Sequence, residues 1–295
     1  MRSGKAVRNI EQYFFRHLGL PQMELRTTGH STQGYKAHSH TEFSVGFLTA
    51  GTTCLTYNGQ DRVVQKGDLV IIEPDRVHAC NPIDGGSRAY HMLYIDARWC
   101  REKLSLLYGK TVTHFCCDQV VIQSSEASSL FMMLVDTLHG GKAQDAAQLL
   151  DQLVLTLLLP HCSPMLVPSR QHELSVRVKQ RLMTDLSQPP SLGDLAEEFG
   201  CARETLIRTF KESYGITPKS FVSNARVEKA KLLLRSGSSI VDVASDMGFA
   251  DQSQFHRAFV NYTASTPRQY QQSGSISDNL SKHWLNRVLV FPILG

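Results

Sequence analysis

The length of 295 residues suggests about two domains, and a hydrophobic content of 42% is enough for packed cores. No run of 18 apolar residues is present, the N-terminus lacks a secretory signal, and the seven cysteines are irregularly spaced, so the sequence argues against a membrane span and predicts a cytoplasmic protein. The net charge is only +4, so a role in binding DNA must rest on where the basic residues lie rather than on their total.

Short segments rich in β-branched and aromatic residues dominate the chain up to about residue 115 and predict strands. The predicted strands are residues 24–28, 41–49, 52–57, 61–64, 68–72 and 88–95. Asn58-Gly59 is a two-residue hairpin signal, and Lys66-Gly67-Asp68 marks a second turn. Many short strands without helices between them favour a sandwich or a barrel. The series H-x-H, N-G and K-G-D-L-V-I-I-x-P-x-x-x-H resembles a cupin jelly roll, a fold that binding proteins, enzymes and storage proteins share.

Three histidines and a glutamate make up the candidate site of this barrel. His38, His40 and Glu42 alternate along a predicted strand and should project from one face, and His78 can face them across the barrel. Such a set can anchor an organic effector or, if it converges, hold a transition metal ion. Metal-binding cupins leave three or four residues between the second histidine and the glutamate, whereas only Thr41 intervenes here. We therefore expect an effector site without a metal or another cofactor; simple hydrogen bonding among these side chains is the alternative.

Two segments with apolar residues at helical spacing follow between residues 126 and 159, and Gly140-Gly141 separates them. They predict an antiparallel helix pair that covers the barrel. Further apolar residues lie on other faces of the pair: Phe131, Val135, Leu155 and Leu159. Since this is more apolar surface than one partner can bury, we favour a homodimer interface over a helix pair consumed by its own domain. Charges at Leu150 or Leu157 are then expected to break the dimer.

Three prolines, Pro160, Pro164 and Pro168, end this helical region. Proline at this density cannot continue a helix and predicts an extended linker. A further helix at about residues 172–186 leads into the next part of the chain.

One pattern occurs twice between residues 191 and 270. Leu192, Leu195, Ala196, Phe199 and Gly200 recur 48 residues later as Ile240, Val243, Ala244, Met247 and Gly248. Each copy predicts a short helix with a small alanine at its packing point, a glycine at its end and a second helix, which together form a helix-turn-helix. In the second helix Leu206 and Phe210, or Phe255 and Phe259, should face the core.

A long helix is predicted between the two units. Thr217 is its candidate N-cap, Pro218 its first residue, and Gly237 closes it. About 18 residues at 1.5 Å each give a strut of roughly 27 Å. The two recognition helices would then lie about 34 Å apart, one turn of B-DNA, so that one monomer can enter two successive major grooves.

The repeat, together with R-V-x-x-A-x-x-L-L from Arg226 and T-P-x-x-Y from Thr266, resembles the double helix-turn-helix domain of the AraC/XylS family of transcription regulators. The resemblance implies a multidomain α+β protein with an N-terminal cupin-like barrel and helix pair and an all-α C-terminal domain. The expected division is a ligand-binding and dimerisation domain at 1–160, a linker at 161–171, the DNA-binding domain at 172–272 and a tail without assigned function at 273–295.

Ten positions early in the two recognition helices are predicted to face DNA. They are Arg203, Glu204, Thr205, Ile207 and Arg208 in the first unit and Gln252, Ser253, Gln254, His256 and Arg257 in the second. The resemblance implies base contacts for Glu204, Ile207, Arg208, Ser253, Gln254 and Arg257. Ile207 replaces the usual polar residue and offers only an apolar contact, and Glu204 opposes phosphate, so the first unit is not expected to read sequence in the same way as the second. Phosphate contact or an internal ion pair is the alternative for Arg208 and Arg257.

The predicted function is a sequence-specific, homodimeric transcription regulator, an activator rather than an enzyme, controlled by a small-molecule effector in the barrel. The expected partners are double-stranded promoter DNA, the effector and RNA polymerase, without a membrane. Two alternatives remain open: a cupin metalloenzyme with an appended DNA-binding domain, and a constitutive DNA-binding dimer.

Overall fold

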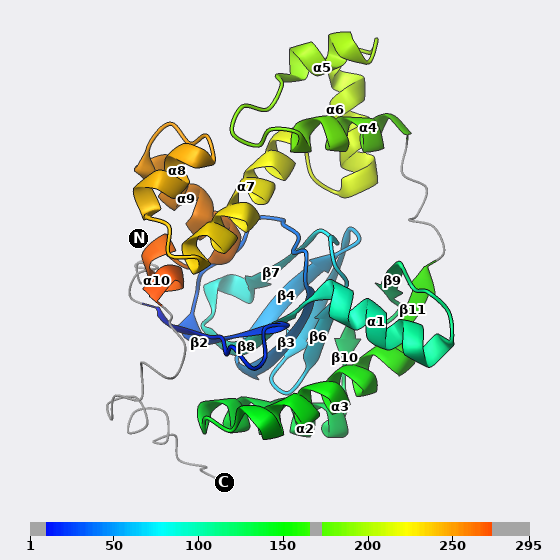
Figure 1. The fold of residues 1–295 in the computed structure, drawn as a ribbon, viewed down its shortest axis with the longest axis vertical. Coiled ribbons are helices and arrows are strands. Elements are labelled where there is room, and N and C mark those ends of the chain that lie inside the picture. The colour runs from blue at the N-terminus through cyan, green and yellow to red at the C-terminus, as the bar shows by residue number, and fades with distance from the viewer. Residues whose placement is uncertain (1–9, 166–172, 273–295) are drawn as a thin grey trace.

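Two antiparallel β-sheets with a cavity between them form the N-terminal part of the molecule. The structure, a computed structural model, describes residues 10–165 and 173–272 (Figure 1). The larger sheet has the order β1 (Glu11–Phe15), β2 (Met23–Ser31), β8 (Arg88–Ile95), β3 (Phe43–Ala50), β6 (Leu69–Ile72) and β10 (Val121–Ile122). The smaller sheet has the order β5 (Gln60–Gln65), β4 (Thr52–Tyr57) and β7 (His78–Pro82), followed in the chain by a short 3-10 helix, η2 (Ile83–Gly85). A separate pair joins β9 (His114–Cys117) to β11 (Cys162–Met165).

Alternating burial fixes how these strands face the core. Along β4, Thr53, Leu55 and Tyr57 are buried, while Thr52 and Thr56 are exposed. This alternation is expected for a strand with one apolar face, because successive side chains point to opposite sides. In the larger sheet the central strand β3 is buried almost throughout, which places it at the centre of the core.

The hairpin signal predicted between β4 and β5 is confirmed. Asn58 and Gly59 both have positive φ angles, 53° and 73°, as a two-residue turn of the primed type requires. The six strands expected from composition all appear, with ends shifted by a few residues. The strands that sequence reasoning missed are short or irregular: β7, for example, has the sequence HACNP, which lacks the β-branched residues that signal a strand.

The predicted helix pair is present as α2 (Ser125–His139) and α3 (Ala143–His161), which pack against each other and against the barrel core (Figure 1). Phe131 and Val135, which sequence reasoning left for a partner, are buried within their own domain. Leu159 is 49% exposed. A further helix, α1 (Ala97–Tyr108), was not predicted; Asp96 caps it, accepting a hydrogen bond from the Trp99 backbone N–H.

The predicted linker differs from the structure at its start. Helix α3 continues through Pro160 to His161, and Cys162–Met165 then pairs with β9, so these residues belong to the N-terminal domain. Proline lacks the N–H that would bond the carbonyl four residues earlier, and the helix ends one residue after Pro160, at His161. The rest of the expected linker, residues 166–172, and the tail at 273–295 lie outside the described residues.

Between residues 173 and 272 the structure describes seven helices: α4 (Glu173–Met183), α5 (Leu192–Glu198), α6 (Arg203–Tyr214), α7 (Pro218–Arg235), α8 (Ile240–Asp246), α9 (Gln252–Thr263) and α10 (Pro267–Gln272). They bury two separate apolar clusters, one around Leu206 and Phe210 and one around Phe255 and Phe259. The two predicted helix-turn-helix units are therefore confirmed as α5–α6 and α8–α9, each with its own core.

Helix α7 joins the two units (Figure 1). The Thr217 side chain caps it by accepting from the Ser220 N–H, and Pro218 occupies its first turn, as predicted. The helix has 18 residues and is followed by Gly237 at a φ of 91°. The separation of about 34 Å between the recognition helices stays a prediction. None of the helices in the described ranges is both long and apolar enough to cross a bilayer.

Candidate ligand pocket and nucleic-acid interface

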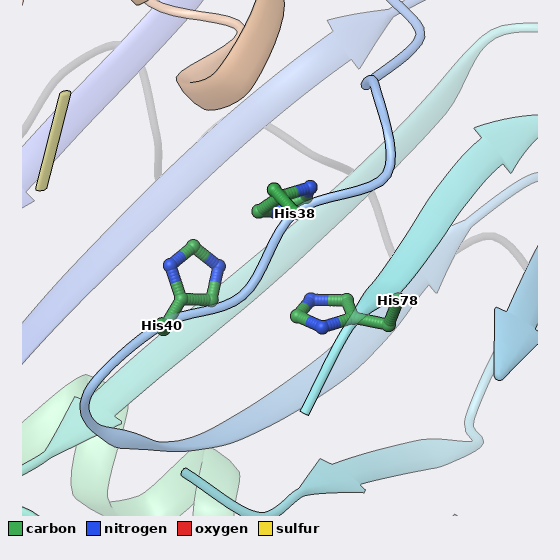
Figure 2. Close-up of side chains that lie close together, drawn as sticks. All are labelled: His38, His40 and His78. Carbon is green, nitrogen blue, oxygen red and sulfur yellow. The ribbon is translucent and has the colours of Figure 1, made fainter. Parts of the chain in front are cut away.

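Three buried histidines, His38, His40 and His78, point into one space between the two sheets (Figure 2). One ring nitrogen from each lies within 4.8 Å of the other two. The ring centroids of His38 and His78 are 4.6 Å apart, and those of His38 and His40 are 4.7 Å apart. These three side chains therefore converge, which the sequence had left open.

The backbone brings the histidines together in a way that sequence reasoning did not foresee. His38 and His78 form an isolated antiparallel bridge, with reciprocal N–H to O distances of 3.0 and 2.8 Å. The predicted strand across His38, His40 and Glu42 is wrong, because β3 begins only at Phe43 after bends at residues 41 and 42. Those bends take Glu42 away from the imidazoles: its carboxylate accepts from the Thr41 hydroxyl and does not line the cavity.

Each of the three rings uses Nδ1 for a hydrogen bond to an acceptor. His38 Nδ1 lies 2.6 Å from the Lys36 carbonyl oxygen, and His78 Nδ1 lies 3.0 Å from the Arg76 carbonyl oxygen. Burial and the neighbouring imidazoles lower the pKa of His38 well below its usual value and that of His78 to about 3. Both rings are therefore neutral at pH 7, with the proton on Nδ1 and a lone pair on Nε2.

The cavity that these rings line has a volume of about 60 Å³. Its other lining residues are Tyr35, Gly46, Phe47, Leu48, Thr53, Val64, Val70, Ile72, Cys80, Arg88, Tyr90, Met92 and Tyr94. Apolar side chains with a few polar groups are the usual lining of a small-molecule site, although such sites typically measure roughly 300–1,000 Å³. Arg88 is 2% exposed, and its Nε atom has no hydrogen-bond partner within the described residues.

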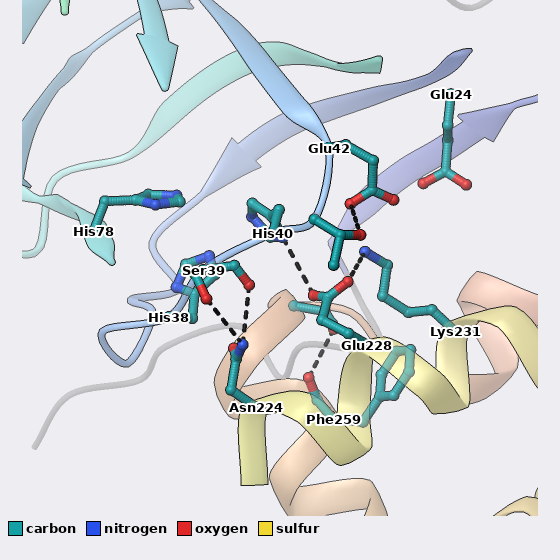
Figure 3. A network of polar contacts seen from close by, with 12 residues as sticks. Glu24, His38, Ser39, His40, Glu42, His78, Asn224, Glu228, Lys231 and Phe259 are labelled. Carbon is teal, nitrogen blue, oxygen red and sulfur yellow. Dashed lines mark hydrogen bonds and ion pairs between the residues drawn. The ribbon is translucent and has the colours of Figure 1, made fainter. Parts of the chain in front are cut away.

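The helix that joins the two DNA-reading units contacts this site directly (Figure 3). His40 Nδ1 lies 3.2 Å from the Glu228 Oε1 atom on α7, and Lys231 Nζ lies 2.7 Å from the other oxygen of the same carboxylate. Asn224, one turn earlier on α7, donates to the Ser39 carbonyl oxygen at 3.0 Å. Burial alone would raise the pKa of Glu228, but Lys231 and His40 outweigh it and lower that pKa, so the carboxylate is ionised.

A second set of polar contacts joins the same two parts of the chain at β2. Glu24 accepts from Arg235 of α7 at 2.7 Å and from the Tyr270 hydroxyl of α10 at 3.2 Å. The buried Arg26 donates to the Thr263 carbonyl oxygen at 2.6 Å. The ring of Phe14, on β1, packs edge-on against Tyr270 at 4.9 Å. The second helix-turn-helix unit is thus held against the ligand-binding part by ionic, polar and aromatic contacts.

The ten predicted DNA-facing residues lie on the outer faces of α6 and α9. In α9 all five, Gln252, Ser253, Gln254, His256 and Arg257, are exposed; in α6 Arg203, Glu204 and Arg208 are exposed, and Thr205 and Ile207 are half-buried. Arg208 and Arg257 form no ion pair within the described ranges, and base or phosphate contact stays a prediction for both. Gln254 already uses its side-chain oxygen to accept from the Ala250 N–H at 2.7 Å.

Sequence reasoning missed Glu228, Asn224 and Arg88. Glu228 lies 188 residues from the histidine that it contacts, and nothing in a helical sequence marks a glutamate as an interdomain partner. Arg88 carried a weak signal, since a charged residue at the start of an apolar strand requires buried acceptors.

Comparisons with known proteins agree with both halves of the molecule. Residues 20–159 match the family model of an AraC-like ligand binding domain, and residues 195–273 match that of a helix-turn-helix domain. The chain is 28% identical over 266 residues to the transcriptional activator RhaR of Escherichia coli, covering 83% of this chain and 89% of RhaR. It is 27% identical over 224 residues to the transcriptional regulator YbfI of Bacillus subtilis, covering 75% of this chain and 81% of YbfI.

Among solved structures, ToxT from Vibrio cholerae has the same arrangement of parts. The match has a TM-score of 0.50 and covers 90% of this chain and 94% of ToxT. At 12% sequence identity the likeness concerns the fold alone.

Proposed function

This chain belongs to the AraC family of transcription regulators, and from that premise we propose that it is an activator whose DNA binding is set by a small molecule in the histidine-lined cavity. The family membership itself makes it a regulator with a ligand-binding domain and a helix-turn-helix DNA-binding domain. The proposal concerns how the first controls the second and in which direction. Activation follows the RhaR relatives, which are described as transcriptional activators.

The observation that carries the proposal is the contact between His40 and Glu228. His40 lines the cavity, and Glu228 lies on the helix that connects the two DNA-reading units. A ligand changes DNA binding only if it favours one arrangement of the two domains over another. A ligand that displaces or polarises the His40 ring alters its hydrogen bond to Glu228. The position of α7 against the ligand-binding domain then changes as well. His38, His40 and His78 supply the polar anchors, and Glu42 is left out because it does not line the cavity.

The size of the cavity sets a condition on the effector. An organic molecule of the size of a sugar needs several times the present volume of about 60 Å³. Its binding therefore requires the sheets or the α7 contact to move apart. If the α7 contact is the one that opens, the opening is itself a means of control, because His40 and Glu228 help to hold the DNA-binding part in place.

The remaining partners follow from the same assignment. We propose that the chain acts in the cytoplasm on promoter DNA, with α6 and α9 in successive major grooves, and that it recruits RNA polymerase as a homodimer. Exposed apolar side chains on the helix pair, Met133 and Leu159 at 54% and 49%, support the dimer. No catalytic role is assigned, since the relatives are transcription regulators.

Footprinting tests the proposal with the full chain and with a fragment from residue 170 to 295. Duplexes for this work are selected from a random library by the full chain itself. The full chain should protect paired sites in a manner that depends on the effector, and the fragment should bind half-sites regardless of it. If both protect the same DNA with the same affinity under all conditions, the N-terminal domain is not the sensor.

A further inference from the structure

We propose that His38, His40 and His78 bind one divalent transition metal ion through their Nε2 atoms, and that Glu228 of the DNA-binding domain is the carboxylate partner of this centre. The bound ion would then tie α7 to the barrel. The coordination is argued from the three rings alone; only its regulatory consequence rests on the proposed function.

The direction of the free lone pairs supports coordination. The carbonyl oxygens of Lys36 and Arg76 can only accept, so the Nδ1 atoms of His38 and His78 must donate to them. The same holds for His40, because its Nδ1 faces a carboxylate. A neutral imidazole that donates through Nδ1 carries its lone pair on Nε2. Three such rings point into one small cavity (Figure 2), which is the donor set that zinc, iron, cobalt and nickel accept.

The spacing is close to that of a formed site. Ring nitrogens at about 2.0–2.1 Å from a tetrahedral ion lie about 3.3 Å from one another. One ring nitrogen from each histidine lies within 4.8 Å of those of the other two, so each ring has to move by about 1 Å or rotate slightly to bind one ion. Two of the three ligands are already fixed by the backbone bridge between His38 and His78. The cavity of about 60 Å³ has room for an ion with one or two waters, since a water needs roughly 10–15 Å³ by the same kind of measure.

Glu228 gives the centre its link to the DNA-binding domain. Histidines that bind a metal commonly donate their second N–H to a carboxylate, which fixes the ring and makes it a better ligand. His40 has this arrangement, with its Nδ1 3.2 Å from Glu228 (Figure 3). The metal in turn affects the contact with Glu228, because an ion on Nε2 withdraws electrons from the ring and makes Nδ1–H a stronger donor. Metal binding is therefore expected to tighten the contact between the barrel and α7.

The positive charge of the proposed site calls for an anion as the remaining ligand of the metal ion. Three neutral imidazoles leave the ion with its full double charge, and Lys231 already neutralises much of Glu228. Arg88 adds a guanidinium to the lining of the same cavity. An anion such as hydroxide or a small carboxylate in the open position would offset this charge.

The proposed metal centre is the opposite of the metal-free site that the sequence predicted. That expectation rested on the short spacing from His40 to Glu42, and the structure shows that Glu42 is turned away from the rings. The carboxylate comes instead from Glu228, 188 residues later in the chain. A spacing rule that looks for all ligands within one sheet segment cannot detect a partner supplied by a second domain.

Titration of the chelator-treated full chain with Zn²⁺ and Co²⁺ tests the site. We expect one ion per chain, with visible absorption of bound Co²⁺ that Zn²⁺ abolishes. His38→Gln and His78→Gln should each weaken binding more than 100-fold, and Glu228→Gln about 10–100-fold. His91→Gln is the matched control, because His91 lies on β8, bonded to the Thr27 hydroxyl and outside the cavity lining.

Two results would overturn the site: no ion retained by the folded wild-type chain, or binding that His38→Gln and His78→Gln leave unchanged. The second result would place the ion elsewhere in the chain. Circular dichroism shows whether each variant is folded. DNA affinity is then measured on a selected duplex with and without Zn²⁺. A change of about 5-fold or more in the wild type, lost in Glu228→Gln, supports the link to α7. If the wild type binds DNA specifically and Zn²⁺ does not change its affinity, only the proposed link between the metal and α7 is refuted. If the wild type binds no DNA specifically, with or without Zn²⁺, the proposed function is refuted instead.

Discussion

His40 in the ligand-binding half and Glu228 in the helix between the two DNA-reading units lie 3.2 Å apart, from Nδ1 to Oε1. Both side chains are largely buried, with exposed fractions of 7% and 14%. The pair connects a cavity to the strut that spaces the recognition helices.

Glu228→Ala should lower the free energy of unfolding of the full chain. It removes the carboxylate that accepts from Lys231, a lysine only 4% exposed, and breaking one partner of a buried ion pair costs about 3–5 kcal/mol. The double variant Glu228→Ala, Lys231→Met should recover part of the loss, since it also removes the buried charge. Urea unfolding measures both; equal stability of the two variants would show that the lysine is already satisfied elsewhere.

Arg257→Ala should cost about 1–3 kcal/mol of binding free energy at the specific site and much less on random DNA. Arg257 is exposed on α9, and within the described residues it forms no ion pair. Arg98→Ala, an exposed arginine on α1, is the control and should change neither affinity. Gel shifts on both duplexes decide the matter: an equal loss on specific and random DNA would assign Arg257 to phosphate.

Leu159→Asp should weaken the homodimer without lowering the melting temperature, because Leu159 is already 49% exposed in the monomer. The sites that the apolar stripe alone suggested, Leu150 and Leu157, are fully buried, so charges there should unfold the domain instead. Analytical ultracentrifugation together with thermal unfolding separates the two effects. A Leu159→Asp chain that sediments like the wild type at all concentrations would place the dimer contact elsewhere or exclude it.

The stability that Glu24 contributes by holding α7 and α10 against β2 should fall at acidic pH. Burial would raise its pKa, but Arg235, Arg16 and Lys231 together lower it below the usual 4.5. A carboxyl group whose pKa is depressed on folding stabilises the fold above its unfolded pKa and loses this contribution as the pH falls through the folded value. The stability difference between wild type and Glu24→Gln should thus be constant above about pH 5.5 and shrink below pH 4.5. A difference that grows on acidification would contradict the assignment.

The parts of the fold that follow local rules were predictable from the sequence. The repeat around Leu206 and Phe255 gave both helix-turn-helix units, and Thr217 with Pro218 gave the start of α7, because caps and apolar spacing act within a few residues. Asn58-Gly59 gave the hairpin for the same reason. Patterns of caps, turn residues and apolar spacing therefore predict single helices and strands and their combination into hairpins and helix-turn-helix units.

The site was only half predictable. The three histidines were identified by their spacing, but Glu42 was wrongly included, since two bends that no composition signal marks turn the chain before β3. Glu228 and Arg88 were missed because their roles depend on packing between segments far apart in the chain. Tertiary contacts of this kind are set by how the domains dock, which single-residue patterns do not contain.

A double-mutant cycle on His40→Gln and Glu228→Gln, with affinity for a selected paired-site duplex as the readout, tests the central claim most directly. If the cavity controls DNA binding through this contact, the effects of the two changes on the free energy of DNA binding should be non-additive by about 0.5–3 kcal/mol. The measurement uses the full chain with the cavity ligand bound. The cycle of His91→Gln with Glu228→Gln should be additive, because among the described residues the two side chains share no hydrogen-bond partner. Strict additivity for His40 and Glu228 as well would contradict the claim that this pair connects the sensor to the DNA-binding domain.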